Sequence, residues 1–291
     1  MLAIVGTVPD HDTPVIHGPL TLHHDRILLD GRAVSVNRGT SALMAASVVT
    51  LDTMGKPAPY GFLVGDVGRG TGSRHLLKYL TDHFNEFDID TLTLHYLQPI
   101  AHWHDKLLHK IEAMKDKPVL IADAGFMYAA KMSGHAESYD LFTPDVGELA
   151  FLADESAPHP FYTRGFILHE ENRAADLIAR AYSHKNAAKN LLVKGENDYI
   201  VQNGKIIETV SEPSEDAMEA IGGTGDSLTG IVSALIAAGY TIPDAAVAAC
   251  KINRMAGHLA KPTPASSIMD IVMHIPEALG CIFVKGSENC V

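Results

Sequence analysis

The sequence has little cysteine, a deficit of positive charge and no long apolar run. Its three cysteines, Cys250, Cys281 and Cys290, form no close CxxC pair, so we expect reduced thiols rather than a disulfide framework or a zinc ribbon. The 23 Lys and Arg residues are outnumbered by 35 Asp and Glu residues, which gives a net charge of −12. Because this charge repels nucleic acid and anionic lipid, a phosphate must be held by local N–H groups and a few cations.

No segment has the pattern of a targeting peptide or a membrane span. The apolar start of the chain is interrupted at Pro9 and has no basic leader. We therefore expect a cytoplasmic protein with a small-molecule substrate and with no nucleic-acid or membrane partner. A homo-oligomer, with the first residues packed on a neighbouring subunit, is one arrangement that the sequence allows.

The alternation of apolar runs and helical segments predicts an α/β fold. The 291 residues, 46% of them apolar, are enough for a well-buried core, and we take residues 1–291 as a single domain. Residues 1–38 contain short β-leaning segments separated by turns such as Asp30-Gly31, which predict a small hairpin layer. From about Thr40, short apolar runs alternate with amphipathic helices, as in a mostly parallel sheet with helices on both faces, a three-layer αβα arrangement.

The expected strands and helices can be placed by residue number. The expected strands are 60–64, 91–94, 118–122, 141–143, 190–193, 199–202 and 205–209. The expected helices are 40–51, 73–84, 100–114, 126–132, 174–189, 226–239, 243–259 and 266–275. Asn203-Gly204 is a strong hairpin signal, so we expect the sheet to be mixed at that edge. Ligands of such sheets lie beyond the carboxyl ends of the strands.

The most informative stretch is glycine-rich and ends at Asp226. It reads Gly222-Gly223-Thr224-Gly225-Asp226 and precedes an apolar helix rich in small residues. Glycines before a helix let backbone N–H groups point at an anion, and the helix dipole favours negative charge there. Because an aspartate in such a hole meets a second negative charge, we interpret Asp226 as a general base that takes a proton from a substrate hydroxyl. The alternative is a tight turn in which Asp226 only caps the helix.

Three further segments follow predicted strands. Asp145 and Glu148 should stand near the ligand-facing edge of the sheet; alternatively, Asp145 caps a helix and Glu148 occupies its first turn. Lys194-Gly195 suits the close approach of a nucleotide, whereas a lone strand-end lysine is otherwise a solvated charge. The glycine cluster at 65–72 matches neither GxGxxG nor a Walker A loop, and forms either a wall of the pocket or a flexible surface turn.

In this order, the segments resemble the ribokinase-like superfamily and, within it, the ADP- or ATP-dependent NAD(P)H-hydrate dehydratases. The resemblance covers about residues 60–280 and rests on Gly65-Asp66-Val67-Gly68, Ala122-Asp123-Ala124, Thr143-Pro144-Asp145-Val146-Gly147-Glu148, Lys194-Gly195 and Gly223-Thr224-Gly225-Asp226. The chain departs from the family in three ways. Asp145 replaces a histidine, Asp66-Val67 fills the middle of a GPG turn, and the usual amino-terminal Gly-Gly-Ser turn is not recognisable. These carboxylates would make the pocket unusually acidic, and such a pocket suits a hydroxyl-rich, cationic or magnesium-bound ligand.

The resemblance implies that the enzyme phosphorylates the hydroxyl of hydrated NADH or NADPH, with ATP or ADP as donor and Mg²⁺, and that phosphate then leaves. The catalytic residues that it implies are Gly223, Thr224, Gly225 and Asp226. The nucleotide-binding residues are Lys194, Gly195, Glu196, Asn197, Asp198 and Gly225. The substrate-binding residues are Gly65, Asp66, Gly68, Asp123, Asp145, Glu148 and Asp226, and Glu148 also orders magnesium through water. Two alternatives stay open, a sugar or vitamin-precursor kinase of the same superfamily and a catalytically silent nucleotide sensor.

Overall fold

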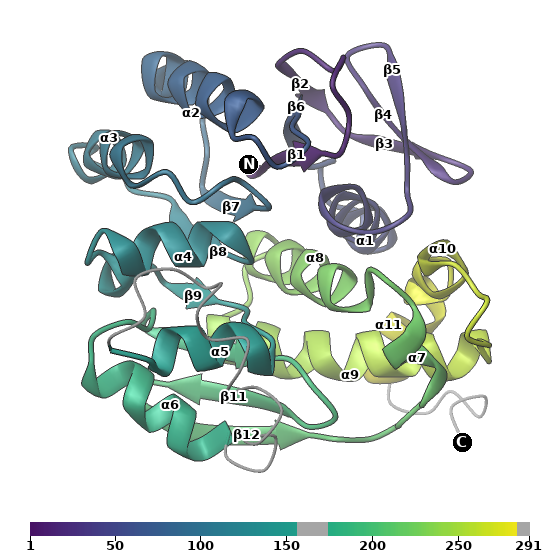
Figure 1. Cartoon of the computed structure of the whole chain (residues 1–291). Coiled ribbons are helices and arrows are strands. Elements are labelled where there is room, and N and C mark those ends of the chain that lie inside the picture. The colour runs from purple at the N-terminus through teal and green to yellow at the C-terminus, as the bar shows by residue number, and fades with distance from the viewer. Residues whose placement is uncertain (156–173, 284–291) are drawn as a thin grey trace. The chain divides into compact units, whose positions relative to one another are not determined.

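The computed structural model describes residues 1–155 and 174–283, and the chain divides into two compact units (Figure 1). The first unit consists of Met1–Ile4, Ile16–Gly61 and Val210–Val291. The second unit consists of Val5–Val15 and Phe62–Thr209. Each unit is therefore assembled from segments far apart in the sequence, and the single domain expected from chain length stays a prediction.

The second unit contains a mostly parallel sheet. Its strands, in spatial order, are β12 (Lys205–Val210), β11 (Asp198–Gln202), β10 (Asn190–Val193), β9 (Leu141–Phe142), β8 (Val119–Ala122), β7 (Thr91–His95) and parts of β1 (Leu2–Val8) and β6 (Tyr60–Gly65). Strands β7 to β10 pair in parallel, whereas β10 and β11 are antiparallel. Strands β7 and β10 are buried at every residue, as continuous apolar runs in parallel sheets are. The predicted parallel sheet with a mixed edge is confirmed.

The apolar start of the chain belongs to this sheet. The expectation that residues 1–38 form a separate hairpin layer is wrong for β1 and for β2 (Ile16–Pro19), because β1 lies between β7 and β6 in the sheet and β2 borders β6. The first five residues of β1 are all buried, which is the pattern of an internal strand. A short apolar run does not itself indicate which strands will flank it, and this is why the sequence left its place undetermined.

The five α-helices that the structure describes in the second unit form a row along the strands (Figure 1). They are α2 (Thr71–His83), α3 (Ala101–Glu112), α4 (Gly125–Met132), α5 (Val146–Ala153) and α6 (Ala174–Ser183), with the short 3-10 helices η1 (Phe84–Glu86) and η2 (Ala136–Ser138). Each α-helix packs against the next in the chain. Helix α3 shows the reason: its buried residues His104, Leu107, Leu108 and Ile111 lie on one helical face.

In the first unit, β3 (Thr21–His23), β4 (Arg26–Leu29) and β5 (Arg32–Ser35) form a small antiparallel sheet. This is the hairpin layer predicted from the β-leaning segments. The turn between β4 and β5 is formed by Asp30 and Gly31, which both have positive φ values. Strand β2 (Ile16–Pro19) belongs to the same unit and contacts β4.

Among the described helices of the first unit, α8 (Thr224–Ala237) lies between α1 (Thr40–Thr53) and α9 (Ile242–Ala260) (Figure 1). The others are α7 (Ala217–Ala220), α10 (Ile268–Val272) and α11 (Ile275–Phe283). The single helix expected over residues 266–275 is wrong, because α10 ends and α11 begins within that range. Ser267 and Asp270 form a capping box that starts α10, a signal that fixes a helix start but not its length.

None of the described helices combines the length and apolarity needed to cross a bilayer. Cys250 is buried and is not part of a disulfide, as expected, but Cys281 is disulfide-bonded. The expectation of reduced thiols is therefore wrong at Cys281, because disulfide formation depends on a proximity that spacing in the sequence does not show. Cys290 lies outside the described residues.

Candidate functional site

The glycine-rich stretch forms the start of α8, as expected for an anion hole. Gly223 is the N-cap, with a φ of 106° that favours glycine, and Thr224 is the first helical residue. Gly223 provides no side-chain cap, so the first N–H groups of α8 depend on other partners. Asp226 lies inside the first turn rather than at the N-cap, and the alternative in which it only caps α8 is wrong.

The carboxylate of Asp226 is held by a second helix. Its Oδ2 atom accepts a hydrogen bond of 2.6 Å from the backbone N–H of Gly39, which is the N-cap of α1. The positive end of the α1 dipole therefore faces the negative charge of Asp226. This contact joins residues 187 positions apart. It also orients the side chain that the sequence predicts to be the base.

The first turn of α8 is also braced from α9. Ser227 Oγ donates to Asn253 Oδ1 over 2.7 Å, and Asn253 Nδ2 donates to the carbonyl oxygen of Thr224 over 3.2 Å. Asn253 is 6% exposed and Ser227 is fully buried. The amide of Asn253 thus fixes the turn that carries Asp226. Sequence reasoning missed both Asn253 and Gly39, because neither lies near the glycine-rich motif in the chain.

In the second unit, the carboxyl ends of four adjacent parallel strands bring polar residues together. His95 ends β7, Asp123 follows β8, Thr143 follows β9 and Lys194 follows β10. Both carboxylate oxygens of Asp123 accept from Lys194 Nζ over 3.0 Å, and His95 Nε2 lies 3.7 Å from Asp123 Oδ2. The side chains of Asp123 and Lys194 are only 2% and 12% exposed. Lys194 is therefore an ion-paired residue, and the alternative of a solvated strand-end charge is wrong.

His95 is a member of this cluster that the sequence did not single out. Its side chain is fully buried beside Asp123. Sixteen histidines scattered along the chain give no converging pattern. The one available signal was its position at the end of a predicted strand, where ligand-facing residues of parallel sheets are found.

Asp145 and Glu148 form a capping box at the start of α5. The backbone N–H of Glu148 donates to Asp145 Oδ1 over 2.7 Å, and that of Asp145 donates to Glu148 Oε2 over 2.9 Å. The capping interpretation is thus confirmed, while a role in substrate binding stays a prediction. Burial, with the negative charges of Asp123 and Asp145, raises the pKa of Glu148 to about 8, against the opposing effect of Lys194. The edge therefore favours a protonated Glu148 or a nearby cation.

The turn that begins at Lys194 is held by a hydrogen bond to the side chain of Asp198, at its other end. Asp198 Oδ1 accepts from the backbone N–H of Gly195 over 3.1 Å, and Asp198 is 4% exposed. The backbone N–H of Lys194 donates to the carbonyl oxygen of Pro144, which joins this turn to the one that precedes α5. Glu196 is exposed and Asn197 is half-buried. Among the polar side chains predicted to bind the nucleotide, that of Glu196 is therefore the most exposed.

The glycine cluster at 65–72 is organised around Asp66. Asp66 Oδ1 accepts from the N–H groups of Gly68 and Gly70, and Oδ2 accepts from the N–H and Oγ of Ser73, all over 2.8–3.0 Å. Partial desolvation alone would raise the pKa of Asp66, but these hydrogen bonds outweigh it and hold the pKa below its usual value. The carboxylate thus occupies the concavity that a bound anion would take, which argues against a flexible turn.

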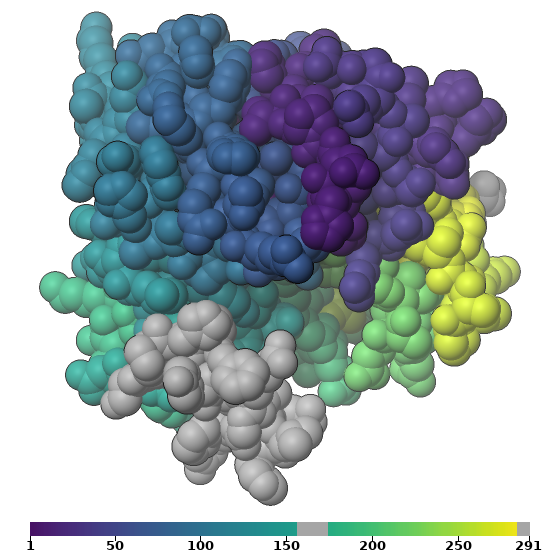
Figure 2. Space-filling model, turned by 45° about the horizontal axis from the view of Figure 1, so that its top comes forward, coloured from purple at the N-terminus to yellow at the C-terminus, as the bar shows by residue number. Residues whose placement is uncertain are grey.

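A second segment covers the start of this turn. The carbonyl oxygen of Asp10 lies 2.3 Å from the position that a Cβ on Gly65 would take, so a side chain there is excluded. Residues of this amino-terminal loop, dark purple in Figure 2, lie at the surface beside the blue residues that follow β6. The close approach explains the glycine at 65 without a ligand. Substrate binding by Gly65, Asp66 and Gly68 stays a prediction.

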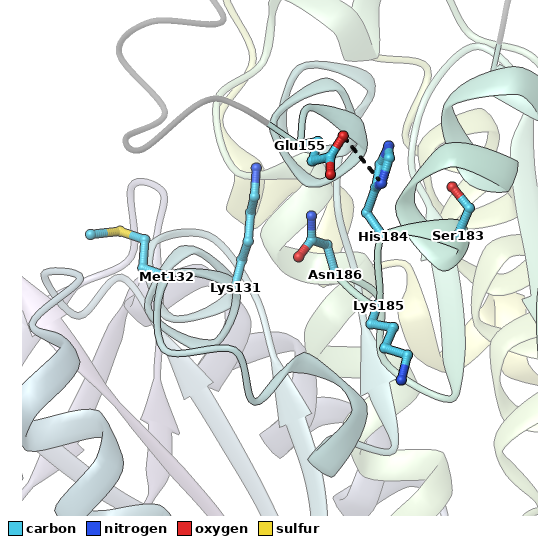
Figure 3. A pocket seen from close by; sticks show the side chains of 7 residues that line it. All are labelled: Lys131, Met132, Glu155, Ser183, His184, Lys185 and Asn186. Atoms are coloured by element: carbon cyan, nitrogen blue, oxygen red, sulfur yellow. Dashed lines mark ion pairs between the residues drawn. The ribbon is translucent and has the colours of Figure 1, made fainter.

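A cavity of about 580 Å³ lies elsewhere in the second unit (Figure 3). It is lined by Lys131, Met132, Glu155, Ser183, His184, Lys185 and Asn186. These residues lie at or just beyond the carboxyl ends of α4, α5 and α6. Because helices following parallel strands run back along the sheet, this cavity lies at the opposite edge from Asp123 and Lys194. We therefore do not assign it to the candidate site.

Comparisons with known proteins agree with the sequence motifs. Residues 100–276 match the model of the NAD(P)H-hydrate dehydratase family. An uncharacterized protein of Methanocaldococcus jannaschii is 43% identical over 238 residues, covering 81% of this chain and 98% of its own. An ADP-dependent (S)-NAD(P)H-hydrate dehydratase of Cenarchaeum symbiosum is 28% identical over 172 residues, 58% of this chain and 55% of its own.

The fold is shared with solved structures of other proteins. Phosphofructokinase-2 from Escherichia coli aligns with a TM-score of 0.53 and 14% identity, over 96% of this chain and 99% of that one. At this identity the likeness concerns the fold alone. Together with the mostly parallel sheet, it confirms the predicted three-layer, ribokinase-like α/β class.

Proposed function

We propose an activity for this chain from one premise: the chain belongs to the NAD(P)H-hydrate dehydratase family. It is an enzyme of the carbohydrate kinase-like type. The proposed reaction is the nucleotide-dependent dehydration of hydrated NADH or NADPH, with ATP or ADP as the phosphoryl donor. The observation that carries this proposal is the placement of Asp226 in the first turn of α8, with its carboxylate held by Gly39 N–H.

The chemistry begins with the hydroxyl group of the hydrated nicotinamide ring. Its oxygen attacks the terminal phosphorus of the nucleotide, the bond from that phosphorus to the leaving nucleotide breaks, and the hydroxyl proton passes to Asp226. The N–H groups of Gly223, Thr224 and Gly225 stabilise the transferred group at the helix N-terminus. Phosphate then leaves the ring with a proton from the neighbouring carbon, and the ring double bond is restored.

The remaining predicted residues bind the two ligands. Lys194, Gly195, Glu196, Asn197 and Asp198 hold the adenine nucleotide, with Lys194 positioned by its ion pair to Asp123. Gly65, Asp66, Gly68, Asp123, Asp145 and Glu148 form the substrate side. The position of Asp145 at the N-cap of α5 gives it a structural role as well.

The acidic edge of the second unit fits magnesium. The carboxylates of Asp123, Asp145 and Glu148 interact electrostatically there, and hard oxygen donors are the ligands that Mg²⁺ prefers. The raised pKa of Glu148 would fall beside a cation, so the ion would restore its charge. Glu148 would hold the ion through water, and the ion would neutralise charge on the phosphates.

The test is turnover by the wild type and Asp226→Asn with ATP or ADP and Mg²⁺. Asparagine retains an oxygen that accepts from Gly39 N–H but cannot take a proton, so we expect kcat to fall by about 10²–10⁴-fold. Asp52→Asn, which removes an exposed carboxylate at the far end of α1, serves as the control. Hydrated NADH and NADPH are offered beside a panel of sugars and vitamin alcohols.

Each result of this assay decides between the candidate functions. Recovery of NADH by the wild type and by Asp52→Asn, but not by Asp226→Asn, supports the dehydratase. Turnover only with a sugar or a vitamin alcohol reassigns the chain to the kinases. Nucleotide binding without turnover of any hydroxyl compound indicates the sensor.

A further inference from the structure

The proposed reaction brings several negative charges to one place in the first unit. A nucleotide carries its phosphates to the start of α8, where Asp226 already supplies a carboxylate. The dipole of α1 faces that carboxylate through Gly39, and the dipole of α8 alone is equivalent to about half a positive charge. The net charge of −12 supplies no general attraction for an anion. A local cation would therefore make a large difference to phosphate binding.

Arg38 is the cation that lies against this turn. An ideal Cβ on Gly222 would be 3.4 Å from Arg38 Cδ and 3.7 Å from its Cβ. An ideal Cβ on Gly223 would be 3.3 Å from Arg38 Cα. The side-chain stem of Arg38 thus packs over Gly222, while its backbone lies against Gly223. The guanidinium group begins one bond beyond Cδ.

The guanidinium group of Arg38 is available to a ligand. The side chain is exposed, and among residues 1–155 and 174–283 it makes no hydrogen bond or ion pair. Arg254, a buried cation of the same unit, instead donates to the carbonyl oxygen of Ser211 over 2.8 Å. Arg38 also directly precedes Gly39, so the residue that holds the base and this cation are neighbours in the chain.

We infer that Arg38 binds the phosphoryl group that is transferred at the start of α8, and is a catalytic residue of the proposed reaction. The planar guanidinium donates two parallel hydrogen bonds to phosphate oxygens, while backbone N–H groups of α8 bind the same group from the helix side. Gly222 leaves room for the Arg38 side-chain stem and Gly223 leaves room for the Arg38 backbone, so these glycines also allow Arg38 to lie close to the turn. This inference rests on the proposed function, because it assigns the nucleotide phosphates to that turn.

The test compares Arg38→Ala, Arg38→Lys and the control Arg32→Ala. Arg32 is an exposed arginine of the same unit on β5, so its removal changes the net charge equally without touching the glycine turn. With hydrated NADH, Mg²⁺ and ATP or ADP, we expect kcat/KM to fall by roughly 10- to 100-fold in Arg38→Ala, since charge-assisted hydrogen bonds are lost. The kcat/KM of Arg38→Lys should lie between those of Arg38→Ala and the wild type, because lysine keeps the charge but lacks the planar group that donates two parallel hydrogen bonds.

Nucleotide binding, measured by calorimetry with Mg·ATP and Mg·ADP, separates this inference from the proposed activity. If the wild type binds nucleotide without dehydrating the hydrate, and Arg38→Ala weakens that binding at least about 10-fold relative to Arg32→Ala, the activity is wrong and the role of Arg38 stands. Equal turnover and binding in Arg38→Ala and Arg32→Ala overturn the inference alone. A wild type that binds neither nucleotide overturns both.

Discussion

The close approach of α8 to α1 at Gly230 is the feature most open to a decisive test. A Cβ on Gly230 would lie 2.3 Å from the carbonyl oxygen of Leu43 and 3.0 Å from Ala46 Cβ. The same contact is bridged by Ser47 Oγ, which donates to the carbonyl oxygens of Gly230 and Leu43 over 2.9 and 3.0 Å. The atom that blocks the new methyl group is thus backbone, which has no rotamer through which to move away.

The expected cost of Gly230→Ala follows from these distances. Restoring van der Waals separation requires α1 and α8 to part by roughly 1 Å, because non-bonded carbon contacts are optimal near 3.5–4.0 Å. Overpacking of a close-packed interior costs about 1–3 kcal/mol, and a backbone clash belongs at the upper end. Alanine returns about 1 kcal/mol of helix propensity. We therefore expect the free energy of unfolding to fall by about 2 kcal/mol.

Gly280→Ala is the matched control. Gly280 also lies within a helix of the first unit, but among residues 1–155 and 174–283, apart from its own neighbours in that helix, no atom lies within 4 Å of the position its Cβ would take. Only the higher helix propensity of alanine then affects stability, so the free energy of unfolding of this variant should exceed that of the wild type by up to about 1 kcal/mol. Urea denaturation of the three proteins, with their m-values compared, measures both changes.

The activity of the same variants provides a second measurement. Gly230 lies one helical turn after Asp226, and Leu43 lies one turn after Gly39, so parting the helices lengthens the Gly39–Asp226 hydrogen bond. Gly230→Ala should therefore lower kcat for the proposed reaction, and Gly280→Ala should not. A Gly230→Ala protein as stable as the Gly280→Ala protein would refute the packing argument. Normal stability with lost activity would show that the contact serves the base alone.

Three further changes test separate parts of the second unit. Asp66→Asn removes the charge from a carboxylate that accepts four hydrogen bonds, and should lower the free energy of unfolding by about 2 kcal/mol in denaturant titrations. Lys131→Met removes the ammonium that donates to the carbonyl oxygens of Phe151 and Asp154, and should lower the free energy of unfolding by about 1–3 kcal/mol. The control Lys185→Met, at an exposed residue, should change it by less than about 0.5 kcal/mol. The pKa of Glu148 is raised from 4.5 to about 8, so the folded state binds a proton that the unfolded chain releases, and stability should fall as pH rises through that window. Thermal unfolding of Glu148→Gln across the same pH range should lack this decline, and an equal decline in both proteins would contradict the assignment to Glu148.

The sequence by itself determined most local structure. Apolar runs such as Leu191–Val193 have no alternation, so they form strands buried on both sides, and Asn203-Gly204 fixes the antiparallel turn after them. The start of α8 could also be predicted, because glycines and a following run of small apolar residues leave few other conformations. These features depend on neighbours in the chain, which is why a single sequence reveals them.

The tertiary structure alone decided which distant residues meet. The N–H of Gly39 reaches Asp226, and Asn253 braces the turn that carries it, although neither contact has a signal in the local pattern. Lys194 and Asp123 form an ion pair because their strands are separated only by β9 in the sheet, not because of their spacing in the chain. Periodicity specifies which face of an element is apolar, whereas the order of strands and the register between helices are set by packing of the whole core. The site therefore owes its residues to the sequence and its geometry to the fold.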